Sequence, residues 1–400
     1  MLIEIFELLK IFEGFFYYLP IHLILFVLFP LVVRRFKAIR YSPCHSLSRR
    51  QVKVSVVIPE YNEDKGVFEK CLASVATNKP DEIIVVHDDS RDEVEFLARK
   101  YGAKVYSFKS RVGKRAALAR GWEMASGDII VHVDSDTILY PNAIEEIIKP
   151  FSDEQVVGVQ GKCLVYRTGS WFSWRMSQLI EANRDWNNKA LNGCLVVIDG
   201  RFNAWRREFL ISQEKAFLNE YFLGRRCEIG DDRFLTQRAN LQGYKTVYQS
   251  TAAAETAAQP TYLKFLKQQL RWARSGYKSF FKDFKLGLAR KAPLAYNIFQ
   301  ICYYLGSISF TFAILHDILL SPPIFALPLW SAIPIATLGS GLIAVIRRLA
   351  VGFYSLTPKE FLMLGFTAIF ISYPLMLYAL ATIRNQSNWQ TRTARSGDRT

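Results

Sequence analysis

The chain has 400 residues, with 51 Lys and Arg against 36 Asp and Glu, a net charge of +15, and a hydrophobic content of 50%. This apolar content excludes an intrinsically disordered chain, and only 22 Gly and 15 Pro exclude a collagen-like or low-complexity fibre. The 29 Phe and 8 Trp in so basic a chain favour a membrane protein that carries a polar catalytic or binding domain.

The first element along the chain is predicted to be a membrane-spanning helix. Residues 14–33 carry no formal charge, and a segment of this length can cross a bilayer. Only basic charges follow between residues 34 and 53, and by the positive-inside rule this flank is cytoplasmic. We therefore assign residues 1–51 to an N-terminal transmembrane helix with a basic cytoplasmic flank.

Residues 52–260 alternate between short β-branched runs and helical patterns. Strands are predicted at Val54–Pro59, Ile83–His87, Lys104–Ser107 and Asp128–Val133, and helices near 66–77, 91–101, 113–125 and 141–149. This alternation predicts βαβ units, and hence an α/β domain with a mainly parallel sheet covered by helices on both faces. Ligands of such sheets bind beyond the carboxyl ends of the strands, where polar clusters follow three of the predicted strands.

Asp134 and Asp136 directly follow one of these strands, so both carboxylates are expected at the same strand end. Two hard oxygen ligands there predict a site for Mg²⁺ or Mn²⁺, which would neutralise a diphosphate. The alternative interpretation of this pattern is an ordinary turn or helix cap.

Two further patterns place charge at predicted helix starts. Residues 111–115 bring three cations to a helix N-terminus, which predicts a phosphate site with Lys114 and Arg115, or else a solvated basic turn. Asp231 and Asp232 open another helix, and adjacent like charges raise one another's pKa, as a base that deprotonates a sugar hydroxyl requires. A helix N-cap made by one of the two Asp explains this pattern equally well.

The C-terminal third is predicted to return to the membrane. The basic amphipathic segment 261–291 predicts an interfacial helix, in which Arg271 would stabilise a leaving phosphate and Trp272 would stack on a sugar. The segment 292–383 is expected to form a transmembrane hairpin, with spans at 294–315 and 325–346, and an interfacial or re-entrant stretch at 361–383. Residues 384–400 would then form a cytoplasmic tail.

The ordered set of motifs resembles membrane-integrated processive family 2 glycosyltransferases: hyaluronan synthases, chitin synthases and the type 3 capsular polysaccharide synthase. The motifs that carry the resemblance are Val56–Glu63, Asp88, Gly113–Arg115, Asp134–Asp136, Phe222–Arg233, Gln268–Trp272 and Trp389–Arg392. The resemblance implies a nucleotide-sugar-binding, glycosyltransferase A-type (Rossmann-like) cytosolic domain with α-helical transmembrane and interfacial helices.

The same resemblance implies roles for individual residues, which fall into groups around the donor and the acceptor. Tyr61, Glu63 and Asp88 would bind the uridine, Lys114, Arg115 and Asp134 would contact the nucleotide, and Asp136 would bind the metal. Asp232 would be the catalytic base, and Gln268, Arg271 and Trp272 would border the diphosphate and the acceptor. Trp389 and Arg392 would belong to a cytoplasmic gating loop.

The function implied is processive, inverting polymerisation of UDP-sugars into an extracellular β-linked polysaccharide, with export through the membrane. The expected partners are the UDP-sugar donor, the growing polysaccharide and membrane lipid, in a multi-pass cell-membrane protein with a cytoplasmic catalytic domain. So few spans leave a homo-oligomer or a lipid-lined pore open. The alternatives are a lipid glycosyltransferase such as a ceramide glucosyltransferase, and a non-catalytic nucleotide-sugar-binding membrane protein. No nucleic-acid partner is expected, because the basic residues gather beside membrane segments.

Overall fold

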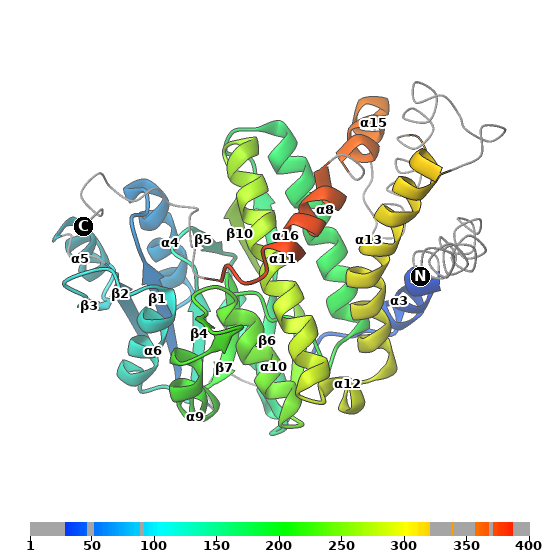
Figure 1. Ribbon diagram of the computed structural model, residues 1–400. Coiled ribbons are helices and arrows are strands. Elements are labelled where there is room, and N and C mark those ends of the chain that lie inside the picture. Colours follow the sequence, from blue (N-terminus) through cyan, green and yellow to red (C-terminus); the bar gives the residue numbers. More distant parts are fainter. Residues whose placement is uncertain are drawn as a thin grey trace.

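The computed structural model describes residues 29–45, 52–88, 92–320, 338, 357–367 and 371–386, and its centre is an eight-stranded sheet (Figure 1). The strand order across this sheet is β3-β2-β1-β4-β7-β6-β10-β5. The strands are β1 Val54–Glu60, β2 Glu82–His87, β3 Lys104–Ser107, β4 Ile129–Val133, β5 Thr137–Leu139, β6 Val156–Tyr166, β7 Phe202–Arg206 and β10 Lys245–Ala257, and a separate hairpin pairs β8 Tyr221–Phe222 with β9 Arg225–Arg226.

The two halves of the sheet differ in strand direction. The four strands predicted from the sequence are confirmed, and β1, β2, β3 and β4 form one continuous parallel set. In the other half, β7 runs antiparallel to both β4 and β6, and β5 runs antiparallel to β10. β6 and β10 nevertheless pair in parallel, and both run in the direction of β1 to β4. The sheet is therefore mixed: the prediction of a mainly parallel sheet is wrong for β5 and β7 and is confirmed for the other strands. The chain enters β7 beside the carboxyl end of β4, where Phe202 pairs with Val133, so β7 has to run back along β4.

Helices cover both faces of the sheet, as predicted (Figure 1). One face is packed by α4 Lys65–Thr77, α5 Asp92–Lys100 and α7 Ala143–Ile148, which is followed by the 3₁₀ helix Lys149–Ser152. The opposite face is packed by α6 Lys114–Met124, α9 Arg207–Leu218 and α10 Asp231–Leu241. Buried β-branched and aromatic side chains fill both interfaces, which anchors the strand ends and helix starts that carry the polar motifs.

A second group of helices lies beside this α/β unit. It comprises α3 Phe29–Ile39, α8 Trp171–Ala190, α11 Tyr262–Lys285, α12 Leu288–Lys291, α13 Leu294–Leu320, α15 Pro358–Thr367 and α16 Tyr373–Ala381. Tyr277 of α11, Tyr304 of α13 and Met376 of α16 share one small core. Gly276 permits this close packing, because a Cβ there would lie 2.2 Å from the Tyr304 hydroxyl.

Within the part of the chain that the structure describes, no helix combines the length and the apolar character needed to cross a bilayer. Helix α13 covers the predicted span 294–315, whereas the predicted spans 14–33 and 325–346 lie mostly outside the described residues. The spans and the interfacial placement of 361–383 therefore stay predictions.

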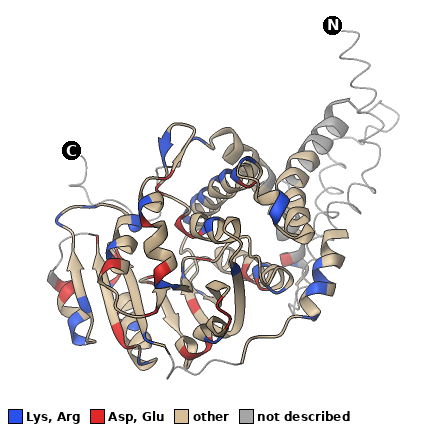
Figure 2. Ribbon diagram, turned by 90° about the horizontal axis from the view of Figure 1, so that it is seen from below, with Lys and Arg blue, Asp and Glu red and all other residues tan. Residues whose placement is uncertain are grey.

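The basic segment 261–291 forms α11 and α12, but its cations do not all lie on an outer surface. Lys278 is 1% exposed, and Lys278 and Lys282 both pair with Glu220 of the α/β unit. Across the ribbon as a whole, cationic and acidic segments are interspersed (Figure 2). Some of the basic residues that we predicted to contact lipid therefore form ion pairs inside the protein.

Candidate functional site

A cavity of about 470 Å³ lies beyond the carboxyl ends of β1, β2 and β4 and extends to α8, α10 and α11. Most of the site residues predicted from the sequence line it. These are Tyr61, Glu63, Asp88, Lys114, Asp134, Asp136, Asp232, Gln268, Arg271 and Trp272. Motifs that are far apart in the chain are therefore brought to one place.

Asp88, at the end of β2, holds the loop that precedes α6. Its two carboxylate oxygens accept hydrogen bonds from the backbone amides of Val112 (2.6 Å) and Gly113 (2.9 Å). Asp88 therefore occupies these two backbone amides at the helix start, where the sequence predicted that a phosphate would bind. Burial raises the pKa of Asp88, while these amides and Arg111 act in the opposite direction. The Arg111 guanidinium also lies 4.6 Å from the centre of the Tyr61 ring.

The turn after β1 is fixed by a buried pair that the sequence analysis did not identify. Glu60 pairs with the imidazole of His87, and both side chains are fully buried. Glu60 also accepts a hydrogen bond from the Glu63 backbone amide (2.7 Å), and Ser135 donates to the Glu63 carboxylate (3.1 Å). The signal available in the sequence was an acid and a histidine at the ends of adjacent strands.

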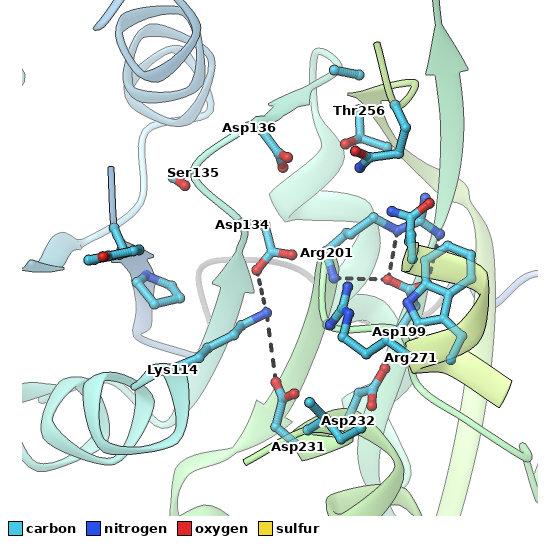
Figure 3. A pocket seen from close by; sticks show the side chains of 18 of the residues that line it. Lys114, Asp134, Ser135, Asp136, Asp199, Arg201, Asp231, Asp232, Thr256 and Arg271 are labelled. Atoms are coloured by element: carbon cyan, nitrogen blue, oxygen red, sulfur yellow. Dashed lines mark hydrogen bonds and ion pairs between the residues drawn. The ribbon is translucent and has the colours of Figure 1, made fainter. Parts of the chain in front are cut away.

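Lys114, in the first turn of α6, connects two acidic parts of the cavity (Figure 3). Its ammonium lies 2.6 Å from an Asp134 oxygen and 3.7 Å from an Asp231 oxygen. Burial lowers the pKa of Lys114, but the two carboxylates outweigh it and raise the pKa. Burial raises the pKa of Asp134 to about 6, against the effect of Lys114 and with a further increase from Asp136. This lysine therefore brings the end of β4 next to the start of α10.

The two acids at the start of α10 occupy different electrostatic environments. Gly230, at φ +78°, is the N-cap residue, and no side chain caps the helix, so the N-cap alternative for the two acids is not realised. Burial and the adjacent Asp231 raise the pKa of Asp232, whose oxygen accepts a hydrogen bond from the Arg233 amide (2.7 Å). The pKa of Asp231 is lowered instead: burial raises it, but Lys114 and other cations outweigh that effect. A carboxylate with a raised pKa is the better proton acceptor.

Asp134 and Asp136 are the residues that could hold a cation. Among the described residues, no group of three or more His, Cys, Asp and Glu side chains is arranged around a metal position. Both carboxylates nevertheless face the cavity (Figure 3), and Mg²⁺ is commonly held by one or two carboxylates together with substrate phosphates. The residues present therefore fit a cation that is bound together with a diphosphate. We call Glu63, Asp88, Asp134 and Asp136 the strand-end wall.

The opposite side of the cavity is a network that the sequence analysis missed, formed by Glu181, Arg184, Asp199 and Arg201 and called here the ion-pair wall. Arg201 binds Asp199 through two nitrogens (2.7 and 2.8 Å) and reaches Glu181 (2.9 Å). Arg184 pairs with the same two acids. Burial raises the pKa of Asp199, but the two guanidiniums outweigh it and hold the pKa well below its usual range. An Asp-Gly-Arg turn after an apolar run was the available signal.

Helix α11 supplies the remaining side of the cavity. Arg271 extends into the cavity among its acidic side chains (Figure 3). Burial lowers the pKa of Arg271, while the surrounding acids, Asp231 and Asp232 first, oppose this. The Arg184 guanidinium lies 4.4 Å from the centre of the Trp272 ring, so one face of this indole is already covered. A sugar that stacks on Trp272 would use the other face, unless Arg184 moves.

Three of the predicted site residues do not line the cavity. Arg115 lies behind it and binds Glu220 (2.6 Å) and the Phe217 carbonyl (2.7 Å), so its assignment to the nucleotide is corrected to an internal ion pair. The reason is helical geometry, because Arg115 follows Lys114 and the next residue points about 100° around the helix. Trp389 and Arg392 lie outside the described residues.

Comparisons with known proteins agree with this arrangement. The sequence profile described as glycosyl transferase family 2 matches residues 55–213. The chain is 32% identical over 364 residues to a hyaluronan synthase of Streptococcus pyogenes serotype M1, covering 85% of this chain and 83% of that protein. It is 28% identical over 358 residues to an N-acetylglucosaminyltransferase of Rhizobium meliloti (strain 1021), covering 85% and 81%.

A solved structure shares the fold. The mannosyltransferase PcManGT from Pyrobaculum calidifontis, in complex with GDP-Man and Mn²⁺, superposes with a TM-score of 0.58 at 18% identity, covering 90% of this chain and 96% of that one. The α/β unit therefore has the glycosyltransferase A-type fold. The chain belongs to the family 2 glycosyltransferases as a hyaluronan synthase-like member, and it is a glycosyltransferase.

Proposed function

We propose that this protein is a processive, inverting glycosyltransferase that polymerises sugars from UDP-sugar donors into a β-linked polysaccharide and exports it across the membrane. The observation that carries the proposal is the bridge made by Lys114, which joins Asp134 of the strand-end wall to Asp231, next to Asp232. The bridge supports the proposal, because the acids proposed to bind the donor and the proposed base line the same cavity. The similarity to a hyaluronan synthase supports polymer formation.

In this proposal the strand-end wall binds the donor. Tyr61, Glu63 and Asp88 hold the uridine, and Lys114 with Asp134 lies beside the diphosphate. A bound Mg²⁺ or Mn²⁺, held by Asp136 together with Asp134, would neutralise charge on the diphosphate. Arg271 stabilises the negative charge that grows on the leaving UDP.

Asp232 acts as the general base. It removes the proton from the acceptor hydroxyl, whose oxygen then attacks the anomeric carbon on the side opposite the leaving UDP. The burial and the neighbouring Asp231 that raise the pKa of Asp232 make it a stronger proton acceptor. Gln268 and Trp272 border the acceptor, and the predicted gating loop with Trp389 and Arg392 closes over the bound donor and excludes water.

We further propose a multi-pass protein of the cell membrane, with the catalytic domain and C-terminus in the cytoplasm. The basic residues between positions 34 and 53 and after position 383 support this orientation. The polymer would leave through helices of the membrane part, in a single chain, a lipid-lined pore or a homo-oligomer. A C-terminal tag that is accessible from outside the cell would contradict this topology.

The test is UDP release by the purified full-length protein with Mg²⁺ or Mn²⁺, with UDP-sugars offered singly and in pairs. Asp232→Asn is the control, and the products are separated by size. A high-mass product supports the polymerase, and the need for one donor or two defines the polymer class. A small lipid-linked product would replace the proposal with a lipid glycosyltransferase. Binding of UDP without any turnover by folded protein would favour a non-catalytic binding protein.

A further inference from the structure

Behind the turn at residues 230–232, outside the lining of the cavity, lies a charged cluster that the proposed mechanism does not use. Its centre is the carboxylate of Glu220, which forms ion pairs with three cations, Arg115 (2.6 Å), Lys282 (2.6 Å) and Lys278 (3.0 Å). The side chains of Lys278 and Glu220 are 1% and 3% exposed. Buried charges are costly unless they are paired and hydrogen-bonded, so the surplus of cations requires a further acceptor.

Two backbone carbonyls serve as further acceptors, that of Phe217 for Arg115 and that of Ile229 for both Lys278 and Arg115. The Ile229 carbonyl is the one next to the turn. It lies 3.2 Å from the Lys278 ammonium and 3.4 Å from a guanidinium nitrogen of Arg115. Ile229 immediately precedes Gly230, whose φ of +78° turns the chain into α10. The orientation of this peptide group sets the direction in which Asp232 leaves the turn.

Gly230 is pressed against the same helix that carries Lys278. A Cβ at this position would lie 2.1 Å from the Ser275 hydroxyl oxygen and 3.5 Å from the Lys278 ammonium. The turn therefore rests on α11, and Lys278 holds it from behind.

One face of α11 thus performs three tasks. Arg271, Ser275 and Lys278 are spaced at i, i+4 and i+7, which places them on the same side of a helix. Arg271 lines the cavity, Ser275 contacts Gly230, and Lys278 binds the Ile229 carbonyl. Because a helix of this length is rigid, the distance between Arg271 and the turn is set by these contacts.

We propose that Lys278, together with Glu220, is a positioning residue that fixes the turn bearing Asp232 relative to Arg271. The inference rests on the proposed function, in which Asp232 is the base and Arg271 stabilises the leaving group. Removing the Lys278 ammonium takes away the shorter of the two hydrogen bonds to the Ile229 carbonyl and leaves only the longer one from Arg115 (3.4 Å), so the turn is held less firmly. The proposed uridine-binding residues on the strand-end wall stay in place. The expected effect is on turnover and not on donor affinity.

The matched control is Lys282, which binds the same carboxylate but has no contact with Ile229 among the described interactions. In the full-length protein, K278M is expected to lower kcat by about 100-fold, the cost of a small misplacement of catalytic groups. The donor KM and the Kd for UDP should stay within about threefold, because this wall is unaltered. K282M should stay within about threefold in all three constants, because it leaves the turn held. If K278M does not fold, the same comparison is made between K278Q and K282Q.

Amide hydrogen exchange provides a readout that does not depend on activity. Peptides covering residues 228–234 should exchange faster in K278M than in wild type, and at the wild-type rate in K282M. Equal losses of kcat in the two members of a pair, a loss at Lys278 that arises from KM alone, or unchanged exchange would each overturn the inference. Absence of turnover by the wild-type protein would instead defeat the proposed function, and the exchange comparison would still decide whether Lys278 holds the turn.

Discussion

The strand-end wall and the ion-pair wall hold their carboxylates in opposite ways. Burial raises the pKa of Asp88, although two backbone amides donate to it, and raises that of Asp134 to about 6, although Lys114 is paired with it. Asp199, in the ion-pair wall, has two guanidinium partners that hold its pKa well below its usual range. We expect a ligand or a cation to neutralise those acids of the first kind that face the cavity, whereas Asp199 holds the structure together through its ion pairs.

The comparison assigns Asp232 to the first kind, and its removal is expected to have the largest effect. D232N should lower sugar transfer by about 1,000-fold or more, because the acceptor hydroxyl loses its general base while the cavity keeps its shape. The measurement is UDP release at saturating donor, with calorimetric UDP binding to show that the donor site is intact. Transfer that stays within about tenfold of wild type would remove Asp232 from the role of base.

Disrupting the ion-pair wall should affect stability first. D199N leaves Arg184 and Arg201 with Glu181 as their remaining acid in this wall, and is expected to lower the free energy of unfolding by about 3 kcal/mol, as for other broken buried ion pairs. The control is E95Q, which breaks the exposed pair with Arg99 in α5 and should cost about 0.5 kcal/mol or less. Both are compared by thermal unfolding. Equal unfolding temperatures for the two variants would show that the wall is not a structural element.

The strand-end wall could be predicted from the sequence because its acids lie close in the sequence to the strands that position them. The β-branched runs that end at His87 and Val133 are followed directly by Asp88 and Asp134, and parallel strands bring their carboxyl ends to one edge. The bounds of β3 were predicted to the residue, and those of β1, β2 and β4 to within one residue at either end.

The ion-pair wall could not be predicted, because its parts meet only through tertiary packing. Glu181 and Arg184 lie on α8, whereas Asp199 and Arg201 lie on the loop before β7, and β7 is inserted antiparallel between β4 and β6. No local pattern specifies such a pairing. The prediction that Arg115 contacts the nucleotide was wrong because helical geometry turns this side chain away from the cavity. Its actual partner, Glu220, lies 105 residues away in the sequence and is not indicated by any local pattern.

Removing an acid of the strand-end wall should change the metal requirement. D136N is expected to raise the Mg²⁺ or Mn²⁺ concentration for half-maximal activity by about tenfold or more, because few protein oxygens are available to hold the cation. D199N provides the contrast between the two walls and should leave this concentration unchanged wherever the protein is folded. An unchanged requirement in D136N would place the cation elsewhere or exclude it from this site.

The smallest effect concerns His132, which lies in β4 beneath the strand-end wall. Burial, and then the charge of Lys114, lower its pKa to about 3, and its Nε2 accepts a hydrogen bond from the Trp122 indole (2.8 Å). The folded protein therefore keeps this imidazole neutral, while the unfolded chain binds a proton below pH 6.5. Acidification consequently favours the unfolded state, by about 1.4 kcal/mol at pH 5.5 relative to neutral pH.

H132Q removes this titration and keeps an acceptor for Trp122, so its stability should decline less than that of wild type between pH 7 and 5. H45Q, at an exposed histidine, is the matched control and should follow the wild-type curve. The measurement is the unfolding temperature across this pH range. Parallel curves for wild type and H132Q would mean that His132 becomes protonated without unfolding. The buried position of His132 in β4 would then accept a positive charge, and the two walls would differ only in the pKa shifts of their carboxylates.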